Sequence, residues 1–394
     1  MREAGDDPPP DWSPRAPATA LAVLVTIGAV WFLLPEKTST HATSIARKHG
    51  AGKSPSTAIA SPRNDHGSQQ PQQLCLGGHV LPAIQLIGVQ KGGTSSLHAD
   101  LVKYIPAVVE AVNAHHAEFR HEHAYFRKEL HFFGNSKRFK KGLEFYARHY
   151  QRCPGQQQQQ QHGARAPPVV IGIDATPHYI RRVEVPAQMR DAFLPFPGAP
   201  RIVVVLRDPV DRAQSWFNMF GPKHVAIDAW AAGRLAAAAK HCGGGPPEAL
   251  RLARNATSPA CDDWIARTTA GQGPIVAGLY ARQLRRWLAA FPAAQLAVAS
   301  FTGYTARPRA VLADLGRFVT GDAAFALPNK KVHAAHKNRH PARRPQALSD
   351  ATRRRLRRLY AGPNRELLAL VRAAGARGLL TTPVRHVKSV DDLF

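Results

Sequence analysis

An apolar strand that runs directly into a glycine-rich turn is the feature that most restricts how this chain can fold. Residues 86–97 read Leu-Ile-Gly-Val-Gln-Lys-Gly-Gly-Thr-Ser-Ser-Leu. Ile87 and Val89 suit a buried parallel strand, and the glycine pair lets a ligand approach the backbone closely. The pattern predicts a strand, a phosphate-binding turn and a helix, although a tight turn without a ligand fits the same residues. The predicted phosphate-binding residues are Lys91, Gly92, Gly93, Thr94, Ser95 and Ser96.

The position of the lysine separates this turn from the one found in nucleoside triphosphatases. In their G-x-x-x-x-G-K-[ST] pattern the lysine follows the glycines. Here Lys91 precedes Gly92 and Gly93. The spacing therefore favours a different phosphate ligand, and a P-loop phosphotransferase is the weaker alternative.

A second segment has the same strand-then-helix character. Residues 202–206 are continuously apolar, which is typical of a strand covered on both faces. Arg207 leaves the end of this strand, and Ser215 lies about two turns into the following helix. Arginine grips a phosphate through two parallel hydrogen bonds, and a serine hydroxyl adds one donor. The segment predicts a second phosphate contact; the alternative is a core strand followed by a surface arginine.

Together the two segments resemble the PAPS-dependent sulfotransferases, whose first motif holds the 5′-phosphosulfate and whose second holds the 3′-phosphate of the adenosine. The resemblance is closest to the heparan sulfate branch, which includes the N-deacetylase/N-sulfotransferases and the 3-O-sulfotransferases. Residues 128–133 (Lys-Glu-Leu-His-Phe-Phe) and 141–146 (Lys-Gly-Leu-Glu-Phe-Tyr) resemble the acceptor-site stretch of that branch. Residues 174–179 (Asp-Ala-Thr-Pro-His-Tyr) are similar to its acidic-Lys-Thr-Pro-x-Tyr segment.

The resemblance continues through the second half of the chain and covers about residues 80 to 370. Residues 278–291 resemble an amphipathic helix that precedes a late strand at 295–300, and the region of Leu356 to Asn364 resembles the closing helix. The family implies an α/β, three-layer, P-loop-like sulfotransferase fold with a mostly parallel central sheet. It also implies PAPS as co-substrate, held in part by a late loop. The residues of that loop are Lys337, Asn338 and Arg339.

The resemblance assigns the chemistry to the segment at 128–133. In-line transfer of the sulfuryl group needs a base behind the acceptor and positive charge at the leaving oxygen. Glu129 matches the catalytic carboxylate, and Phe132 and Phe133 are expected to position it and raise its pKa. Lys91 would neutralise charge on the bridging oxygen. His131 is a candidate for orienting the acceptor or the carboxylate, with a packed core histidine as the alternative.

Two departures from the family pattern affect the site. Ala175 stands where relatives usually carry a lysine that helps to hold the sulfuryl group, and no cysteine follows Cys261 to form their C-terminal hairpin pair.

A histidine-rich stretch at 115–123 has no Cys or Asp partners at metal-ligand spacing nearby, so we expect no metal. Of the four cysteines, Cys242 and Cys261 flank an insertion and are the favoured pair, with free thiols as the alternative.

The amino terminus predicts a membrane anchor. Residues 1–17 form a short tail, and residues 18–34 are an uncharged run of 17 residues, the shortest that can span a bilayer. A cleaved signal peptide is the competing interpretation. Residues 35–78 read as a disordered stem, and 79–394 as the catalytic domain with low-complexity insertions near 154–168 and 221–262. The charges that flank the run do not set its orientation in the membrane. The resemblance to the family implies a single-pass Golgi membrane protein with a lumenal catalytic domain.

The charge balance indicates anionic partners. The chain carries 53 Lys and Arg against 27 Asp and Glu, a formal charge of +26. Nucleic-acid binding is not expected, since no C₂H₂, RRM or helix-turn-helix pattern is present. The predicted function is transfer of the sulfuryl group of PAPS to a hydroxyl or amino group of a glycan. A noncatalytic polyanion-binding protein on the same fold is the main alternative.

Overall fold

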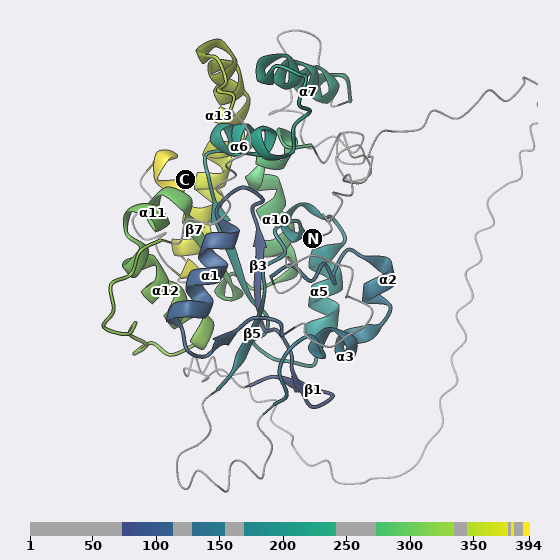
Figure 1. The fold of residues 1–394 in the computed structure, drawn as a ribbon, viewed down its shortest axis with the longest axis vertical. Helices are drawn as coiled ribbons and strands as arrows, with labels where there is room; N and C mark the ends of the chain where they lie inside the picture. Colours follow the sequence, from purple (N-terminus) through teal and green to yellow (C-terminus); the bar gives the residue numbers. More distant parts are fainter. Residues whose placement is uncertain are drawn as a thin grey trace, which may run out of the picture. The chain divides into compact units, whose positions relative to one another are not determined.

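A computed structural model describes residues 73–112, 128–153, 169–241, 273–334, 345–376, 380–381 and 389–394. Its centre is a sheet in the order β4-β5-β3-β6-β7-β8, in which every described pair of neighbours is parallel (Figure 1). The strands are β3 (Ile84–Gly88), β4 (Val108–Val109), β5 (Ile171–Asp174), β6 (Arg201–Leu206), β7 (Leu296–Ser300) and β8 (Leu380–Thr381). The expected α/β fold with a mostly parallel central sheet is confirmed.

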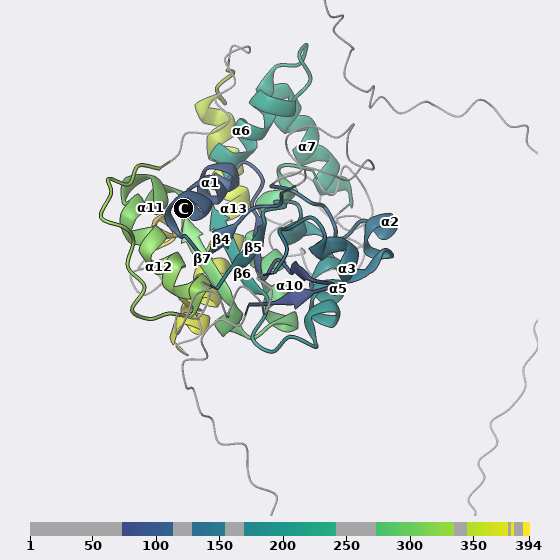
Figure 2. The same ribbon diagram turned by 60° about the horizontal axis from the view of Figure 1, so that its bottom comes forward.

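The buried side chains of β6 alternate between the two faces of the sheet, and both faces are covered. Ile202 and Val204 belong to one buried cluster, and Val203 and Val205 belong to another. Successive side chains of a strand point to opposite faces, so a continuously apolar strand needs cover on both sides. The helices α5 (Val185–Phe193), α10 (Tyr280–Ala290) and α13 (Asp350–Ala376) contribute to the first cluster, and α1 (Thr94–Tyr104), α11 (Phe301–Ala306) and α12 (Pro308–Thr320) to the second (Figure 2).

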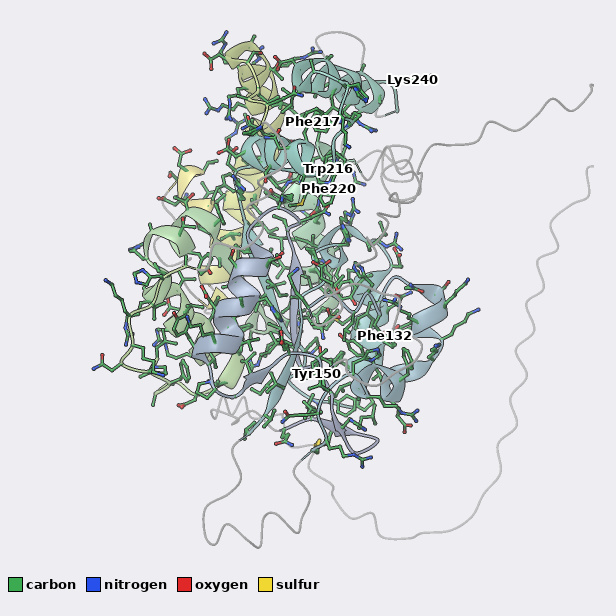
Figure 3. The ribbon with its side chains drawn as sticks, viewed as in Figure 1. Phe132, Tyr150, Trp216, Phe217, Phe220 and Lys240 are labelled. Carbon is green, nitrogen blue, oxygen red and sulfur yellow. A yellow bond between two sulfur atoms is a disulfide. The ribbon has the colours of Figure 1, made fainter. Side chains whose placement is uncertain are left out.

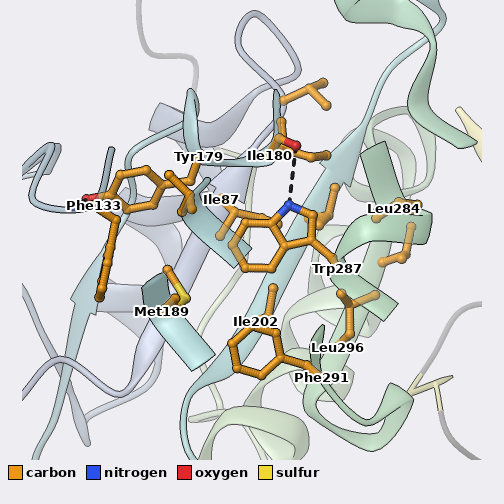
Figure 4. Packing of buried hydrophobic residues seen from close by; sticks show 14 of the residues in the cluster. Ile87, Phe133, Tyr179, Ile180, Met189, Ile202, Leu284, Trp287, Phe291 and Leu296 are labelled. Carbon is orange, nitrogen blue, oxygen red and sulfur yellow. Dashed lines mark hydrogen bonds between the residues drawn. The ribbon is translucent and has the colours of Figure 1, made fainter. Parts of the chain in front are cut away.

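The amphipathic helix α10 closes the first face, as its sequence predicts. Leu284 and Trp287 are buried, whereas Arg285 between them is exposed. The Trp287 Nε1–H donates to the carbonyl of Ile180 at 3.3 Å, so the indole satisfies its one donor inside the core (Figure 4). This contact ties α10 to the short 3₁₀ turn Tyr179–Arg181 that follows β5.

A third cluster joins α6 (Pro209–Phe220), α7 (Ile227–His241) and α13. Trp216 on α6 stacks on Trp230 of α7, with ring centroids 6.0 Å apart, and Phe217 packs beside them (Figure 3). The helix α7 lies within the predicted insertion at 221–262, and residues 242–262 of that insertion fall outside the described residues. Part of the segment that sequence composition marks as an insertion is therefore a packed helix.

The structure pairs two cysteines that the sequence analysis does not single out. Cys75 in the hairpin of β1 (Cys75–Leu76) and β2 (His79–Val80) forms a disulfide with Cys153, which follows α3 (Gly142–Ala147). Ordered structure thus begins before residue 79. The predicted pair, Cys242 and Cys261, lies outside the described residues, as do the predicted insertion at 154–168, the tail, the run at 18–34 and residues 35–72 of the predicted stem. Within the described ranges, no helix has the length and apolar character needed to cross a membrane.

Loss of this disulfide should destabilise the fold strongly. The bond closes a loop with a sequence separation of 78, for which loop-closure entropy predicts about 4 kcal/mol of stabilisation. We expect Cys75→Ser to lower the free energy of urea unfolding by roughly that amount. Cys153→Ser should have the same effect and the double variant no further one, whereas additive losses would show that the two sulfurs contribute separately.

Candidate active site

The turn after β3 brings the backbone of the predicted phosphate-binding residues close to neighbouring elements. A Cβ on Gly92 would lie 2.9 Å from the carbonyl oxygen of Val205, and one on Gly93 would lie 2.7 Å from the ring of Phe301. Gly93 also has φ 96°, in the left-handed region, and caps the start of α1. Both glycines are required by this geometry. A phosphate at this turn would accept from the N–H groups of the first turn of α1, which begins with Thr94, Ser95 and Ser96.

Lys91 and Arg207 lie together at the ends of β3 and β6. The Arg207 Nη1 donates to the Lys91 carbonyl at 3.3 Å, and its guanidinium lies 4.8 Å from the ring centre of Phe301. Burial, followed by the charge of Arg207, lowers the pKa of Lys91 to about 8. Two cations next to each other at the carboxyl ends of parallel strands favour an anionic ligand there.

The helix α6 turns the predicted serine toward the same place. Asp208 caps it by accepting from the N–H groups of Val210 and Asp211, both at 2.9 Å. Met219 Sδ lies 3.2 Å from Lys91 Nζ, and Ser215 is four residues earlier. Residues four apart share a helix face, so Ser215 lies on the face of α6 that meets Lys91.

The segment 128–133 is clamped by its backbone to the end of β5. The N–H of Ala175 donates to the Lys128 carbonyl at 2.7 Å, and the N–H of Leu130 donates to Asp174 at 3.3 Å. The hydroxyl of Tyr179 accepts from the backbone N–H groups of Phe132 at 2.8 Å and Phe133 at 3.2 Å. These four bonds over six residues leave the segment little freedom, which suits a part that holds a candidate base in place.

Asp174 is the centre of this clamp, and the sequence analysis did not give it a role. It is fully buried and accepts from the hydroxyls of Tyr146 at 2.7 Å, Thr176 at 2.7 Å and Tyr179 at 2.9 Å. Burial raises its pKa, and these hydrogen bonds oppose the shift. A carboxyl-bearing residue at the end of a buried strand, followed by a tyrosine at the fifth position, is the signal that could have revealed it.

Glu129 lies between two potential cations. Its carboxylate contacts the ammonium of Lys128 and lies 3.4 Å from Nε2 of His131. Burial acts to raise the pKa of Glu129, but the hydrogen bond from His131 and the charge of Lys128 outweigh burial and lower it to about 2. The expectation that the phenylalanine pair raises this pKa is therefore wrong.

Of the two roles expected for the phenylalanine pair, positioning of the segment fits the structure. Phe132 and Phe133 are buried, and Phe132 stacks on Tyr146 with ring centroids 4.4 Å apart (Figure 3). The rings thus anchor the segment in the core while its charged residues set the protonation of Glu129. His131 stands at φ 47° and its side chain is 37% exposed, so it is not the packed core histidine of the alternative interpretation.

The base candidate and the phosphate turn meet at α1. His98, one turn after Thr94, is buried, and burial and the charge of Lys128 lower its pKa to about 4 while Glu129 opposes that shift. Lys128 and Glu129 therefore lie close to the first turns of the helix that begins at Gly93. The structure brings Glu129 and His131 to the same end of the sheet as the phosphate turn and Arg207.

Some predicted site residues have other positions. Ala175 is fully buried and supplies no charge, and Lys337, Asn338 and Arg339 lie outside the described residues. The histidine-rich stretch at 115–123 also lies outside them. Over the ranges that the structure describes, no group of three or more His, Cys, Asp or Glu side chains is placed to hold a metal ion.

Known proteins share sequence and structural similarity with this chain. A family model described as "Sulfotransferase domain" matches residues 81–338. Heparan sulfate glucosamine 3-O-sulfotransferase 5 of Mus musculus is 29% identical over 151 residues, which are 38% of this chain and 34% of that protein. The Homo sapiens protein of the same name is 29% identical over 135 residues, 34% of this chain and 30% of that protein. The match thus spans about a third of these curated relatives. A crystal structure of a sulfotransferase from Alicyclobacillus acidocaldarius is 21% identical, with a TM-score of 0.43, and covers 73% of this chain and 95% of that one.

Proposed function

This chain belongs to the sulfotransferase family, and on that basis we propose that it moves the sulfuryl group of PAPS to a hydroxyl or amino group of a glycan. The observation that carries the proposal is the meeting of three parts at one end of the sheet. These parts are the phosphate turn with Lys91, the arginine that leaves β6, and the carboxylate of Glu129.

Each part has a role in the in-line transfer. The acceptor oxygen or nitrogen forms a bond to sulfur as the bond from sulfur to the bridging phosphate oxygen breaks. Glu129, charged because its pKa is about 2, takes the proton that the acceptor loses. Lys91 neutralises the charge that grows on the phosphate oxygen. A carboxylate of low pKa is sufficient as a base because the acceptor becomes strongly acidic while its bond to sulfur forms.

The phosphate contacts are divided between the two motifs. Lys91, Gly92, Gly93 and the first turn of α1 hold the 5′-phosphosulfate, and Arg207 and Ser215 hold the 3′-phosphate. The late loop at 337–339 completes the cofactor contacts. No metal enters this scheme, since lysine, arginine and helix N–H groups supply the positive charge that phosphoryl enzymes take from Mg²⁺.

The glycan acceptor and the location rest on separate features. The relatives that match are heparan sulfate enzymes by name, and a formal charge of +26 suits an anionic polysaccharide. A disulfide between Cys75 and Cys153 fits an oxidising compartment. We place the domain from about residue 75 onward in the Golgi lumen, with residues 18–34 as a signal anchor and the segment between them as a stem.

Binding of 3′-phosphoadenosine 5′-phosphate (PAP) tests the proposal directly. Calorimetric titration of the full chain should give micromolar affinity for PAP and much weaker affinity for ATP and AMP. Arg207→Ala should weaken PAP binding by roughly 10- to 100-fold, because it removes charge-assisted hydrogen bonds to a phosphate. Ser215→Ala should have a smaller effect of the same sign.

Arg201→Ala is the matched control, since Arg201 begins the same strand and its guanidinium lies over the ring of Phe318 instead. It should leave PAP affinity unchanged. Preference for ATP would favour a P-loop phosphotransferase, and a folded protein that binds no nucleotide would favour a noncatalytic polyanion binder.

A further inference from the structure

Three arginines that the proposed mechanism does not use lie beside the site. Arg282 and Arg286 are four residues apart on α10, and therefore on one face of it. Arg181 ends the 3₁₀ turn packed against that helix, and the Nη2 of Arg286 donates to the Arg181 carbonyl at 3.4 Å. We refer to Arg181, Arg282 and Arg286 as the arginine cluster. All three are half-buried, so they are accessible to a ligand.

The cluster is dominated by positive charge. Burial, followed by the charges of Arg212 and Arg182, lowers the pKa of Arg181 to about 10. Burial, followed by the charge of Arg286, lowers the pKa of Arg282 to about 10. Guanidinium groups resist such shifts, so downward shifts on two of them mark a place where cations are crowded and partly removed from water.

Arg286 is only partly compensated by its acidic neighbour. Glu184 acts on Arg286 but also pairs with Arg182 at 3.1 Å, and its side chain is 44% exposed. The Nε of Arg286 is buried and has no hydrogen-bond partner. Arg212 is a neighbour of Arg181 and is only 1% exposed. Its Nε is also buried and has no hydrogen-bond partner. Buried guanidinium N–H groups without acceptors are costly, and an anion bound at the exposed part of the cluster would offset the crowded positive charge.

The cluster borders the acceptor side of the site. Burial, followed by the charge of Arg181, lowers the pKa of His178, and the charge of Glu129 opposes this shift, so both charged side chains act on the same imidazole. The ring of His178 lies 5.6 Å from that of His131, which contacts Glu129. Arg181 is therefore close to the base, separated from it by two histidine rings.

We propose that the arginine cluster binds a sulfate or carboxylate group of the acceptor glycan, next to the sugar whose hydroxyl or amine faces Glu129. This rests on the proposed function and identifies where an anionic acceptor is recognised. Guanidinium forks bind planar or tetrahedral oxyanions through paired hydrogen bonds, and an anion there removes the repulsion between the arginines.

The same helix supplies a matched control. Arg285 lies directly beside Arg286 in the sequence but is exposed and forms an ion pair with Glu366 on α13. Substitution of Arg285 removes the same charge from the same helix without touching the cluster. A surface that attracts polyanions only through total charge would respond alike to the single changes at Arg285 and Arg286.

The test uses the full chain saturated with PAP and titrated calorimetrically with a heparin hexasaccharide. Arg282→Gln/Arg286→Gln should weaken hexasaccharide binding at least tenfold, whereas Arg285→Gln should change it less than twofold. A parallel titration with an unsulfated heparosan hexasaccharide, which carries only carboxylates, separates the two anions. Loss confined to heparin assigns the cluster to sulfate, and loss with both assigns it to carboxylate.

Equal affinities in the double variant and the wild type would overturn the proposal, and so would equal losses from Arg285→Gln. PAP affinity, measured first, should be the same in all these proteins. Failure of the wild type to bind PAP would instead contradict the proposed function. The hexasaccharide titrations would then still decide whether the arginine cluster binds an anionic glycan. Thermal melting checks the fold. If the double variant melts early, Arg286→Gln alone is compared with Arg285→Gln and should weaken binding at least threefold.

Discussion

Replacement of Glu129 by glutamine should lower the rate of sulfuryl transfer by about 10² to 10⁴-fold, the usual contribution of a positioned general base. The amide has nearly the same shape but cannot take the proton of the acceptor. PAP should bind with unchanged affinity, because the contacts of Glu129 are with Lys128 and His131 and not with the phosphate turn. Initial rates with labelled PAPS and heparan sulfate as acceptor, together with calorimetric PAP titration, measure both effects.

Glu144→Gln is the control for this experiment. Glu144 lies on α3 and is exposed, so the same chemical change there should leave the rate unaltered. Full turnover by the Glu129 variant would show that the base is elsewhere. The wild-type enzyme should also show no loss of rate from protonation of Glu129 above about pH 4. A carboxyl group whose pKa is lowered to about 2 remains charged through that range.

Lys91→Ala should lower kcat/KM by about 10²- to 10³-fold and should also weaken PAP binding, because one charge meets both the bound phosphate and the leaving oxygen. Rates at saturating and limiting PAPS separate the two contributions. Lys103→Ala, in the exposed last turn of α1, removes the same charge from the helix that follows the turn and should change neither value. A loss of affinity with kcat unchanged would limit Lys91 to ground-state binding.

The pH dependence of PAP binding should identify Lys91 by its own titration. In the free protein the Lys91 pKa is about 8, and a bound phosphate raises it, so binding above that pH requires uptake of a proton. PAP affinity in the wild type should therefore fall as pH rises through 8, by up to tenfold per unit. Below pH 8, where the lysine is already charged, this contribution should be flat. Lys91→Ala should lack the fall, and a fall of the same size in that variant would assign it to another group.

Local sequence was sufficient for the framework of the site. The apolar runs that become β3 and β6, the glycines after β3 and the amphipathic pattern of α10 each depend on neighbours in the chain. Gly93 has no side chain to oppose the left-handed backbone that it adopts, and Arg207 directly follows the apolar run at 202–206. For these reasons the turn, the second motif and the parallel sheet could be predicted from the sequence.

The tertiary structure decided what depends on distant residues. Cys75 pairs with Cys153, and the backbone of the acceptor segment is held by Asp174 and Tyr179, more than forty residues away. The pKa of Glu129 moves down, against the expectation from its apolar neighbours in sequence. Phe132 and Phe133 point into the core, and the charges of Lys128 and His131 set the balance instead.

The arginine cluster shows the same division between sequence and structure. Arg181 and Arg286 are 105 residues apart in the chain, and only the packing of α10 against the turn after β5 brings them together. The sequence by itself determined which residues form strands, turns and helices, because those preferences act over a few residues. Only the fold decided protonation and charge crowding, because electrostatic interactions depend on distance in space and on burial, and neither is written in the order of the residues.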